Sequence, residues 1–284
     1  MKTINCMSQV KSTSKNIILW GIIALCLALP GRAKGDSVPA QYLELAYDIY
    51  LGGILAASAD IAIESDGKRY RINNTAHSLG MLDFLIGFRS QNEVLGRIFE
   101  KQTKPIKYAA TGIRAGATRS VRIDYSAETG IQFTARPGAV EDEREAVPTH
   151  HLPGTVDPFS ALYQALLRHL ETGECNGRSK VFDGRRRYDF LFEAVGDRAT
   201  TGPLYSGLAQ VCRVRQIVIA GFSQRVWLPN LMRPQRADIW LAKVRQDLPA
   251  LPARLEADAG LGTMIAHLVA IGGRKHPPGE GPSE

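Results

Sequence analysis

Apolar and polar residues alternate over most of the chain beyond the first forty residues, which is the period of a β-strand buried on one face. In the stretch 47–77, Ile61 and Ile63 alternate with smaller or polar neighbours. The same period returns at 121–125 and at 131–134. The pattern therefore predicts a mainly β protein built from antiparallel strands.

Glycine-containing pairs separate these runs and indicate hairpin turns. Such pairs lie between strand-like runs at three places: Gly52-Gly53, Asp66-Gly67 and Asp183-Gly184. An Asp-Gly pair tolerates the positive φ angles that a tight type I′ turn requires. We therefore expect a hairpin at each of these positions, and a further turn at 126–130.

One helix is well marked after Asp157. Asp157 is a favourable N-cap, Pro158 suits the first helical position, and Gly173 stands where a C′ residue belongs. Apolar residues recur between these ends at helical spacing: Leu162, Ala165, Leu166 and Leu170. A second segment, 80–87, is either a short helix or an apolar turn.

The last third of the chain returns to strand character. Residues 236–242 and 252–257 look like a hairpin pair, and 262–272 looks like a final strand. No change of composition forces a boundary, so we expect a single β-rich domain over 34–271. The tail 272–284 lacks apolar residues and is predicted to be disordered.

The first 33 residues have the order of a secretory signal peptide. Three lysines and no acid precede an uncharged run at 17–29, and small residues follow around Gly31 and Ala33. That run is shorter than the roughly 20 residues of a membrane span. We therefore expect residues 1–33 to be cleaved during export to the periplasm, leaving no integral membrane segment. An uncleaved N-terminal anchor is the alternative.

Export changes the interpretation of the charge. The chain has a net charge of +7, from 35 basic and 28 acidic residues. Four of the basic residues lie in the leader, so the remainder has 31 against 28, a net of +3. This balance is ordinary and gives no indication of nucleic-acid binding.

Two cysteines, Cys175 and Cys212, remain once the leader is removed with Cys6 and Cys26. Two cysteines in an exported chain most simply form one disulfide, which we predict here. Two separate buried thiols are the alternative. The spacing matches no CxxC redox motif and no cysteine pair of the type that binds metal.

An arginine run follows the turn at Asp183. Arg185, Arg186 and Arg187 are consecutive, and consecutive strand residues point to opposite faces, so the three cannot converge on one phosphate. A surface-charged hairpin is the favoured interpretation, and an anion site is the alternative. A possible interaction surface for a protein partner combines two of them with two arginines of a later strand: Arg185, Arg187, Arg213 and Arg215.

The chain lacks the common catalytic motifs. It contains no GxSxG, HExxH, P-loop or GxGxxG sequence. His150-His151 is the one adjacent histidine pair and falls in a predicted loop. We therefore predict no catalytic, cofactor-binding or metal-binding residue, no cofactor, and a non-enzymatic function. A hydrolase without a recognisable motif is a remaining alternative, because catalytic triads are defined in space.

Several stretches occur together in an order that resembles a known family. They are YDIYLGGI at 47–54, DPFSALYQ at 157–164, the cysteines around VFDGRRRYD at 181–189, and IWLA followed by LPARLE near the end. Over about residues 42–270 the chain resembles the exported bacterial family catalogued as domain of unknown function 3108 (DUF3108). The resemblance implies a β-rich periplasmic protein without an established activity, with Cys175 and Cys212 joined.

The final hairpin is also loosely similar to periplasmic lipoprotein carriers and to envelope-integrity proteins with a β-spiral. That likeness implies a strongly curved antiparallel sheet, an incomplete barrel or β-spiral, with one main helix packed against it. The expected function is binding of a lipid, a lipoprotein acyl chain or another apolar ligand in the cell envelope. The alternative is a structural or interaction protein whose partner is an envelope protein.

Overall fold

The computed structural model describes residues 41–139, 143–222, 236–259 and 262–273. The predicted leader lies outside these residues, as does nearly all of the predicted tail. The described residues form a sheet of thirteen strands in the order β7-β6-β5-β4-β3-β2-β1-β13-β12-β11-β10-β9-β8. Every pair of neighbours is antiparallel.

The strands have the following bounds: β1 Gln41–Leu51, β2 Ile54–Ser65, β3 Arg69–Ser78, β4 Arg89–Phe99, β5 Gln102–Arg114, β6 Ala117–Ser126, β7 Gly130–Arg136, β8 Gly177–Phe182, β9 Arg187–Thr201, β10 Ser206–Ala220, β11 Arg236–Ala242, β12 Leu251–Ala259 and β13 Gly262–Ile271. The helices are α1 (Gly80–Ile86) and α2 (Pro158–Thr172), and Thr149–His151 form a 3-10 turn.

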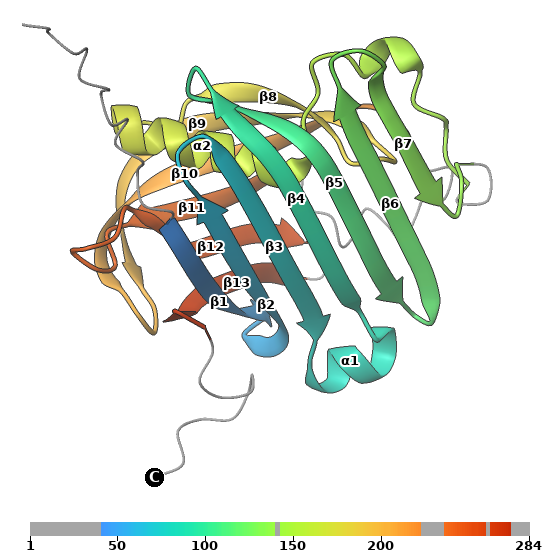
Figure 1. The fold of residues 1–284 in the computed structure, drawn as a ribbon. Coiled ribbons are helices and arrows are strands. Elements are labelled where there is room, and N and C mark those ends of the chain that lie inside the picture. The colour runs from blue at the N-terminus through green and yellow to red at the C-terminus, as the bar shows by residue number, and fades with distance from the viewer. Residues whose placement is uncertain (1–40, 140–142, 223–235, 260–261, 274–284) are drawn as a thin grey trace, which may run out of the picture. The chain divides into compact units, whose positions relative to one another are not determined.

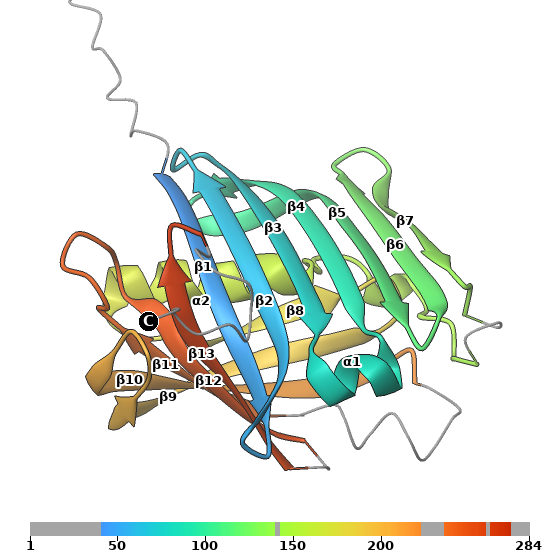
Figure 2. The ribbon, with the colours of Figure 1, turned by 90° about the horizontal axis from the view of Figure 1, so that it is seen from below.

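The sheet bends so that its two arms face each other, with α2 between them (Figures 1 and 2). One arm contains β2 to β7 and the other contains β8 to β12, and β1 pairs with β13 where the arms join. The predicted fold class is confirmed: the protein is mainly β, the antiparallel sheet is strongly curved and not closed, and one main helix packs inside it.

The two edges of the sheet meet through side chains. The rings of Phe133 in β7 and Phe182 in β8 pack edge to face with their centroids 4.8 Å apart. Gly184 in the β8–β9 turn has φ +83°, and a Cβ there would overlap the side chain of Val121 in β6. The turn therefore needs glycine both for its backbone angle and for the approach of the opposite arm.

The local signals in the sequence produce the predicted elements. Turns lie at 52–53, 66–67 and 183–184, and the Asp66 carboxylate accepts hydrogen bonds from the backbone N–H groups of Lys68 and Arg69. In α2 the Asp157 carboxylate accepts the N–H groups of Phe159 and Ser160, and Gly173 ends the helix at φ 74°. The segment 80–87 forms the short helix α1 rather than a turn.

Strand β4 has no clear alternation of apolar and polar residues, so the sequence pattern did not predict this strand. Part of its inner surface is polar: the Asn92 side-chain amide donates to the Asn74 Oδ1 of β3 at 3.0 Å. The Tyr108 hydroxyl of β5 donates to Asn92 Oδ1 at 3.2 Å. These hydrogen bonds satisfy polar groups across three strands and so replace the apolar contacts on which pattern recognition depends.

Candidate functional site: an apolar cavity beside helix α2

The interior beside α2 is partly filled and partly empty. Near the N-terminal end of α2, fully buried side chains from both arms interlock, among them Val94, Ile123 and Phe182. Farther along α2, toward β1 and β12, lies a cavity of about 270 Å³. This cavity is not fully enclosed, so a molecule can reach it from the surface.

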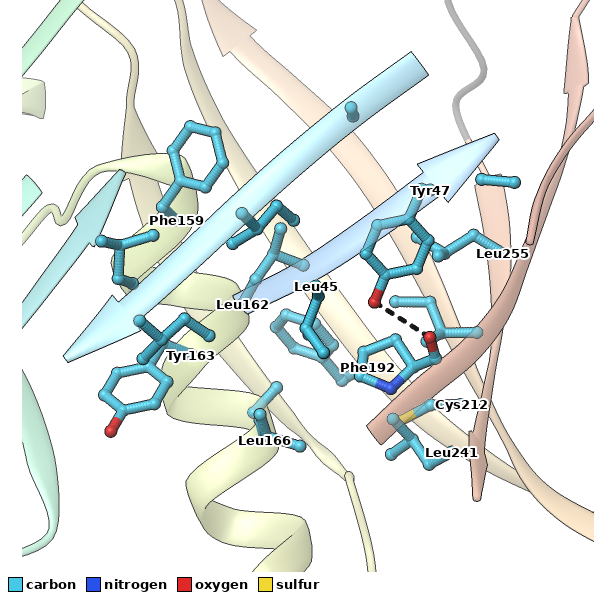
Figure 3. Close-up of a pocket in the computed structure, with 18 of the residues that line it drawn as sticks. Leu45, Tyr47, Phe159, Leu162, Tyr163, Leu166, Phe192, Cys212, Leu241 and Leu255 are labelled. Carbon is cyan, nitrogen blue, oxygen red and sulfur yellow. Dashed lines mark hydrogen bonds between the residues drawn. The ribbon is translucent and has the colours of Figure 1, made fainter. Parts of the chain in front are cut away.

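Three sets of side chains form the wall of the cavity (Figure 3). The set on α2 is Phe159, Leu162, Tyr163, Ala165 and Leu166; the set on β1 to β3 is Leu45, Tyr47, Ile49, Ala59, Ile61, Ile63 and Ile72; the set on β9 to β13 is Phe192, Cys212, Ile239, Leu241, Pro252, Leu255 and Ala266. Among the residues that the structure describes, no charged side chain and no side-chain amide lines it. The site can therefore hold an apolar molecule but offers almost no polar group to orient one.

Helix α2 explains why the space stays open. Ala161 and Ala165 are buried, and they pack α2 against Tyr188, Phe192 and Val214 of the arm formed by β8 to β10. The larger Phe159, Leu162 and Leu166 project from α2 into the cavity (Figure 3). Leu162 keeps 37% of its surface exposed although it lines the cavity. Short side chains thus let α2 pack closely against the arm formed by β8 to β10.

Hydrogen bonds anchor α2 on its polar side. Ser160 is buried, and its hydroxyl lies 2.7 Å from the Tyr70 hydroxyl of β3 and also bonds to the Asp157 carboxylate. The Thr103 hydroxyl of β5 donates to the Ser160 carbonyl at 3.1 Å. Burial raises the pKa of Asp157 to about 6. The helix is therefore held by directional contacts on the side away from the cavity.

Tyr47 and Tyr163 provide the hydroxyl groups of the cavity wall, as far as the described residues form it. The Tyr47 hydroxyl donates to the Pro252 carbonyl at 3.0 Å and is satisfied within the protein. Burial raises the pKa of Tyr47 and also that of Tyr163. Both phenols thus stay neutral over the physiological pH range, and among the described residues that line the cavity none carries a charge to attract an ionic ligand.

The cavity adjoins two further hollows through shared wall residues. Tyr163 also lines a hollow of about 420 Å³ at the rim, together with Ile98, Lys101 and Glu171. Ile49 also lines a hollow of about 280 Å³ beneath α1, together with Leu82 and Met264. The three spaces follow one another along the inside of the sheet, from the C-terminal half of α2 to α1.

Cys175 and Cys212 form a disulfide, with their Cα atoms 6.1 Å apart. Cys175 lies three residues beyond the last residue of α2, and Cys212 faces inward from β10 and lines the cavity. A bulge between Val211 and Cys212 lets neighbouring residues of β10 both be buried. The bond therefore ties the C-terminal end of α2 to the cavity wall.

The structure distributes the arginine run in three directions. Arg185 donates to the carbonyls of Arg136 at 2.7 Å and Pro137 at 2.9 Å, and so links the β8–β9 turn to the end of β7. Arg186 binds the Asp183 carboxylate of its own turn at 2.8 Å. Arg187 is only 4% exposed and binds Asp189 at 2.7 Å. The run helps to close the sheet and does not converge on one anion.

The four arginines considered as an interaction surface are not gathered on one exposed face. Arg187 is buried, which removes it from any such surface. Arg213 binds Asp238 at 2.8 Å, and Arg215 pairs with Glu193. In the β9–β10 register Arg213 lies opposite Glu193, whereas Arg187 lies opposite Ala220, several residues farther along the strand. A partner surface of this kind would have to use Arg213 and Arg215 without Arg187.

A serine–histidine pair exists in the structure, although the sequence pattern did not reveal it. Ser58 Oγ lies 3.1 Å from His77 Nε2 across the β2–β3 pair. Ser58 is 0% exposed, so a substrate cannot reach its hydroxyl without rearrangement. Among the described residues no group of three or more histidine, cysteine, aspartate or glutamate side chains could hold a metal ion.

The sequence model of one family, described as "Protein of unknown function (DUF3108)", matches residues 46–269. This chain belongs to the DUF3108 family. The match spans every described strand at least in part, together with the whole cavity wall except Leu45. The resemblance noted from the ordered sequence stretches is thereby confirmed.

Other comparisons add little beyond the family. A solved structure described as a β-barrel-like protein of domain of unknown function DUF1849, from Brucella abortus, shares 12% identity at a TM-score of 0.40, and the alignment covers 81% of this chain and 96% of that chain. Comparison with curated proteins found no match. Within the described residues no helix is long and apolar enough to cross a membrane.

Proposed function

We propose that this protein binds a lipid or another apolar ligand in the cavity between α2 and the curved sheet, and that it does so in the cell envelope. The observation that carries the proposal is a wall built only from apolar and aromatic side chains around about 270 Å³ of empty space. An engineered apolar cavity of about 150 Å³ already stays dry and binds benzene. A larger apolar space is therefore suited to a hydrocarbon.

The apolar lining of the cavity favours an elongated hydrocarbon as the ligand over a polar metabolite. A site for a polar ligand normally includes a few precisely placed polar groups that fix its orientation. Here the two tyrosines are the polar members of the wall, and the hydroxyl of Tyr47 is already bonded to Pro252. The adjoining hollows at Tyr163 and Ile49 extend the space in two directions, which suits an acyl chain.

The cellular location is part of the same proposal. Residues 1–33 have the order of a secretory signal, and Cys175 and Cys212 form a disulfide. Disulfides persist in oxidising compartments, of which the bacterial periplasm is one. Isolation of the protein from the periplasmic fraction, with an N-terminus close to residue 34, is the expected result.

Native mass spectrometry tests the ligand directly. Protein purified from periplasm without detergent should carry adducts that solvent extraction resolves into phospholipid or free acyl chains. A clean apo mass from such material, together with no binding of the fluorescent fatty acid cis-parinaric acid, would contradict the proposal.

A matched pair of variants ties binding to the cavity. Ala59 lines the cavity, and Ala62 lies on the same strand and points to the opposite face of the sheet. Ala59→Phe should occupy the space and reduce cis-parinaric acid binding by about tenfold or more. Ala62→Phe adds the same ring outside and should leave binding unchanged. Equal binding by both variants would place the ligand elsewhere.

A further inference from the structure

The hollow that shares Tyr163 with the cavity differs in character from the other connected spaces, and we call it the rim hollow. Its wall contains five side chains with polar groups: Gln41, Ser65, Lys101, Tyr163 and Glu171. The hollow beneath α1, at the other end of the cavity, is lined mainly by apolar side chains such as Leu82 and Met264. The connected spaces are therefore polar at one end and apolar along the rest, which is the pattern of an amphiphilic molecule.

Tyr163 lies between the cavity and the rim hollow. Its side chain lines both spaces. In Figure 3 its hydroxyl points away from Leu45 and Phe192, which line the cavity. A molecule that lies in the cavity can therefore extend past Tyr163 and place a polar group in the rim hollow.

The turn that carries Lys101 has an unusual backbone. Glu100 and Lys101 connect β4 to β5 with positive φ angles of 49° and 61°. Such a pair of angles is typical of a type I′ turn, which normally uses glycine, asparagine or aspartate. The Gln164 side chain of α2 holds this turn, because it donates to the Lys101 carbonyl at 2.8 Å and accepts the N–H of Thr103. Backbone strain that is held in place in this way clusters at ligand sites.

Lys101 and Glu171 are the charged side chains of the rim hollow, as far as the described residues form it. They pair with each other, and their side chains are 75% and 43% exposed. An ammonium group has more than one N–H donor and a carboxylate has several acceptor positions, so the pair can bind further groups while it stays intact. A free anion is attracted by Lys101 and repelled by Glu171. A zwitterion in the opposite orientation is attracted by both.

The cavity has room for one acyl chain. An engineered apolar cavity of about 150 Å³ holds a benzene molecule. At about 270 Å³ this cavity holds less than twice that amount of hydrocarbon. The adjoining hollows share a single wall residue each with the cavity, Tyr163 and Ile49, so they lengthen the space and do not widen it. Two acyl chains side by side would exceed this space.

We infer that the ligand is a lipid with one acyl chain and a zwitterionic phosphoethanolamine head, a lysophosphatidylethanolamine. Its chain lies in the cavity and points toward α1. Its head lies in the rim hollow, with the phosphate beside Lys101 and the ammonium beside Glu171. This inference rests on the proposed ligand binding, to which it adds the number of chains, the kind of head and the direction of the chain.

Displacement of cis-parinaric acid by lipids below their critical micelle concentrations tests the inference. Dioctanoyl phosphatidylethanolamine has the head and the acyl carbon count of palmitoyl lysophosphatidylethanolamine, but on two chains. The lysolipid should displace the probe at a concentration about tenfold or more below that of the dioctanoyl lipid. Palmitate, with the same chain and an anionic head, should need about threefold to fivefold more than the lysolipid. Equal displacement by the lysolipid and either comparison lipid would overturn the inference.

A neutralised pair ties head recognition to the rim hollow. Lys101→Gln/Glu171→Gln keeps the net charge and should abolish the preference for the lysolipid over palmitate, with cis-parinaric acid binding within about twofold of the wild type. The matched control Arg122→Gln/Asp124→Asn neutralises an exposed pair on β6 that lines none of the three spaces, and it should keep the preference. Equal loss in both variants, or a preference retained without Lys101 and Glu171, would overturn the assignment of the head.

The same measurements separate this inference from the proposed function. A wild type that binds cis-parinaric acid but is displaced equally by all three lipids would leave ligand binding standing and reject the inference. A wild type that binds neither cis-parinaric acid nor the lysolipid would reject both.

Discussion

The side of α2 that faces β8 to β10 and the side that faces β1 bury different kinds of residue. Toward β8 to β10 the helix presents Ala161 and Ala165, and the aromatic residues of β9 fill the remaining space. Toward β1 it presents Leu162, which lines the cavity and keeps 37% of its surface exposed. A large side chain therefore borders empty space here, while the small Ala161 is close-packed.

The difference shows that apolar residues facing the interior of this fold are not all buried to the same extent. Phe182 is 0% exposed at the filled end of the interior, whereas Leu162 is 37% exposed inside the same curved sheet. Dense packing where the arms meet gives the fold its stability. The region beside Leu162 is then free to serve another purpose, and we propose that this purpose is ligand binding.

Truncation of one residue from each region should give the largest difference in the free energy of unfolding. Phe182→Ala should lower the free energy of unfolding by about 3–5 kcal/mol, because it leaves a void between close-packed side chains. Leu162→Ala should cost only about 1 kcal/mol, because part of that side chain contacts no other atom. Urea denaturation of both variants measures the difference, and equal losses would mean that the cavity is filled in solution.

Loss of the disulfide should loosen the cavity side selectively. Cys175 and Cys212 are 37 residues apart, so replacing both with serine should cost up to about 4 kcal/mol on the chain-entropy model. Hydrogen exchange should then increase at the C-terminal end of α2 and in β10 more than around Ile123 and Phe182. A uniform increase would show that the two regions unfold as one unit.

Enlargement of an alanine should destabilise the protein in the close-packed region and leave its stability nearly unchanged at the cavity. Ala161→Phe would overpack a residue that is 0% exposed and should destabilise the protein by about 1–3 kcal/mol or more. Ala59→Phe extends into the cavity and should change stability by less than about 1 kcal/mol. Thermal unfolding of the two purified variants distinguishes these outcomes, and a large loss at Ala59 would argue against empty space.

A smaller, pH-dependent effect should arise at the anchored side of α2. Burial raises the pKa of Asp157 to about 6, above the value of about 3.9 expected in the unfolded chain. The protonated carboxyl is therefore favoured in the folded state, so this contribution to stability is fully present below about pH 4 and is lost as the pH rises through about 6.

The variant Asp157→Asn isolates this effect, because asparagine remains a good N-cap and cannot ionise. The stability advantage of this variant over the wild type should grow between about pH 4 and about pH 7. Melting temperatures measured across that range should diverge with increasing pH. Parallel curves would show that Asp157 does not titrate differently in the folded and unfolded states.

The sequence determined the elements whose signals are local. Asp157, Pro158 and Gly173 set the ends of α2, and the glycine pairs set the hairpins, because caps and turns depend on the conformations of a few adjacent residues. The alternation of apolar residues indicated the antiparallel strands. Adjacent strand residues point to opposite faces, so the sequence also indicated that the arginine run does not converge on one anion. In the structure Arg185, Arg186 and Arg187 bind partners in three separate directions.

Only the tertiary structure decided whether inward-facing residues touch each other. Leu162 and Leu166 have the same helical spacing as core residues, and no sequence pattern distinguishes a side chain that lines a cavity from one that fills a core. The outcome depends on how far the sheet bends and on how close Ala161 lets α2 approach β9. The cavity, the Ser58–His77 pair and the rim hollow all arise from contacts between residues distant in sequence, so they appear only when the chain is folded.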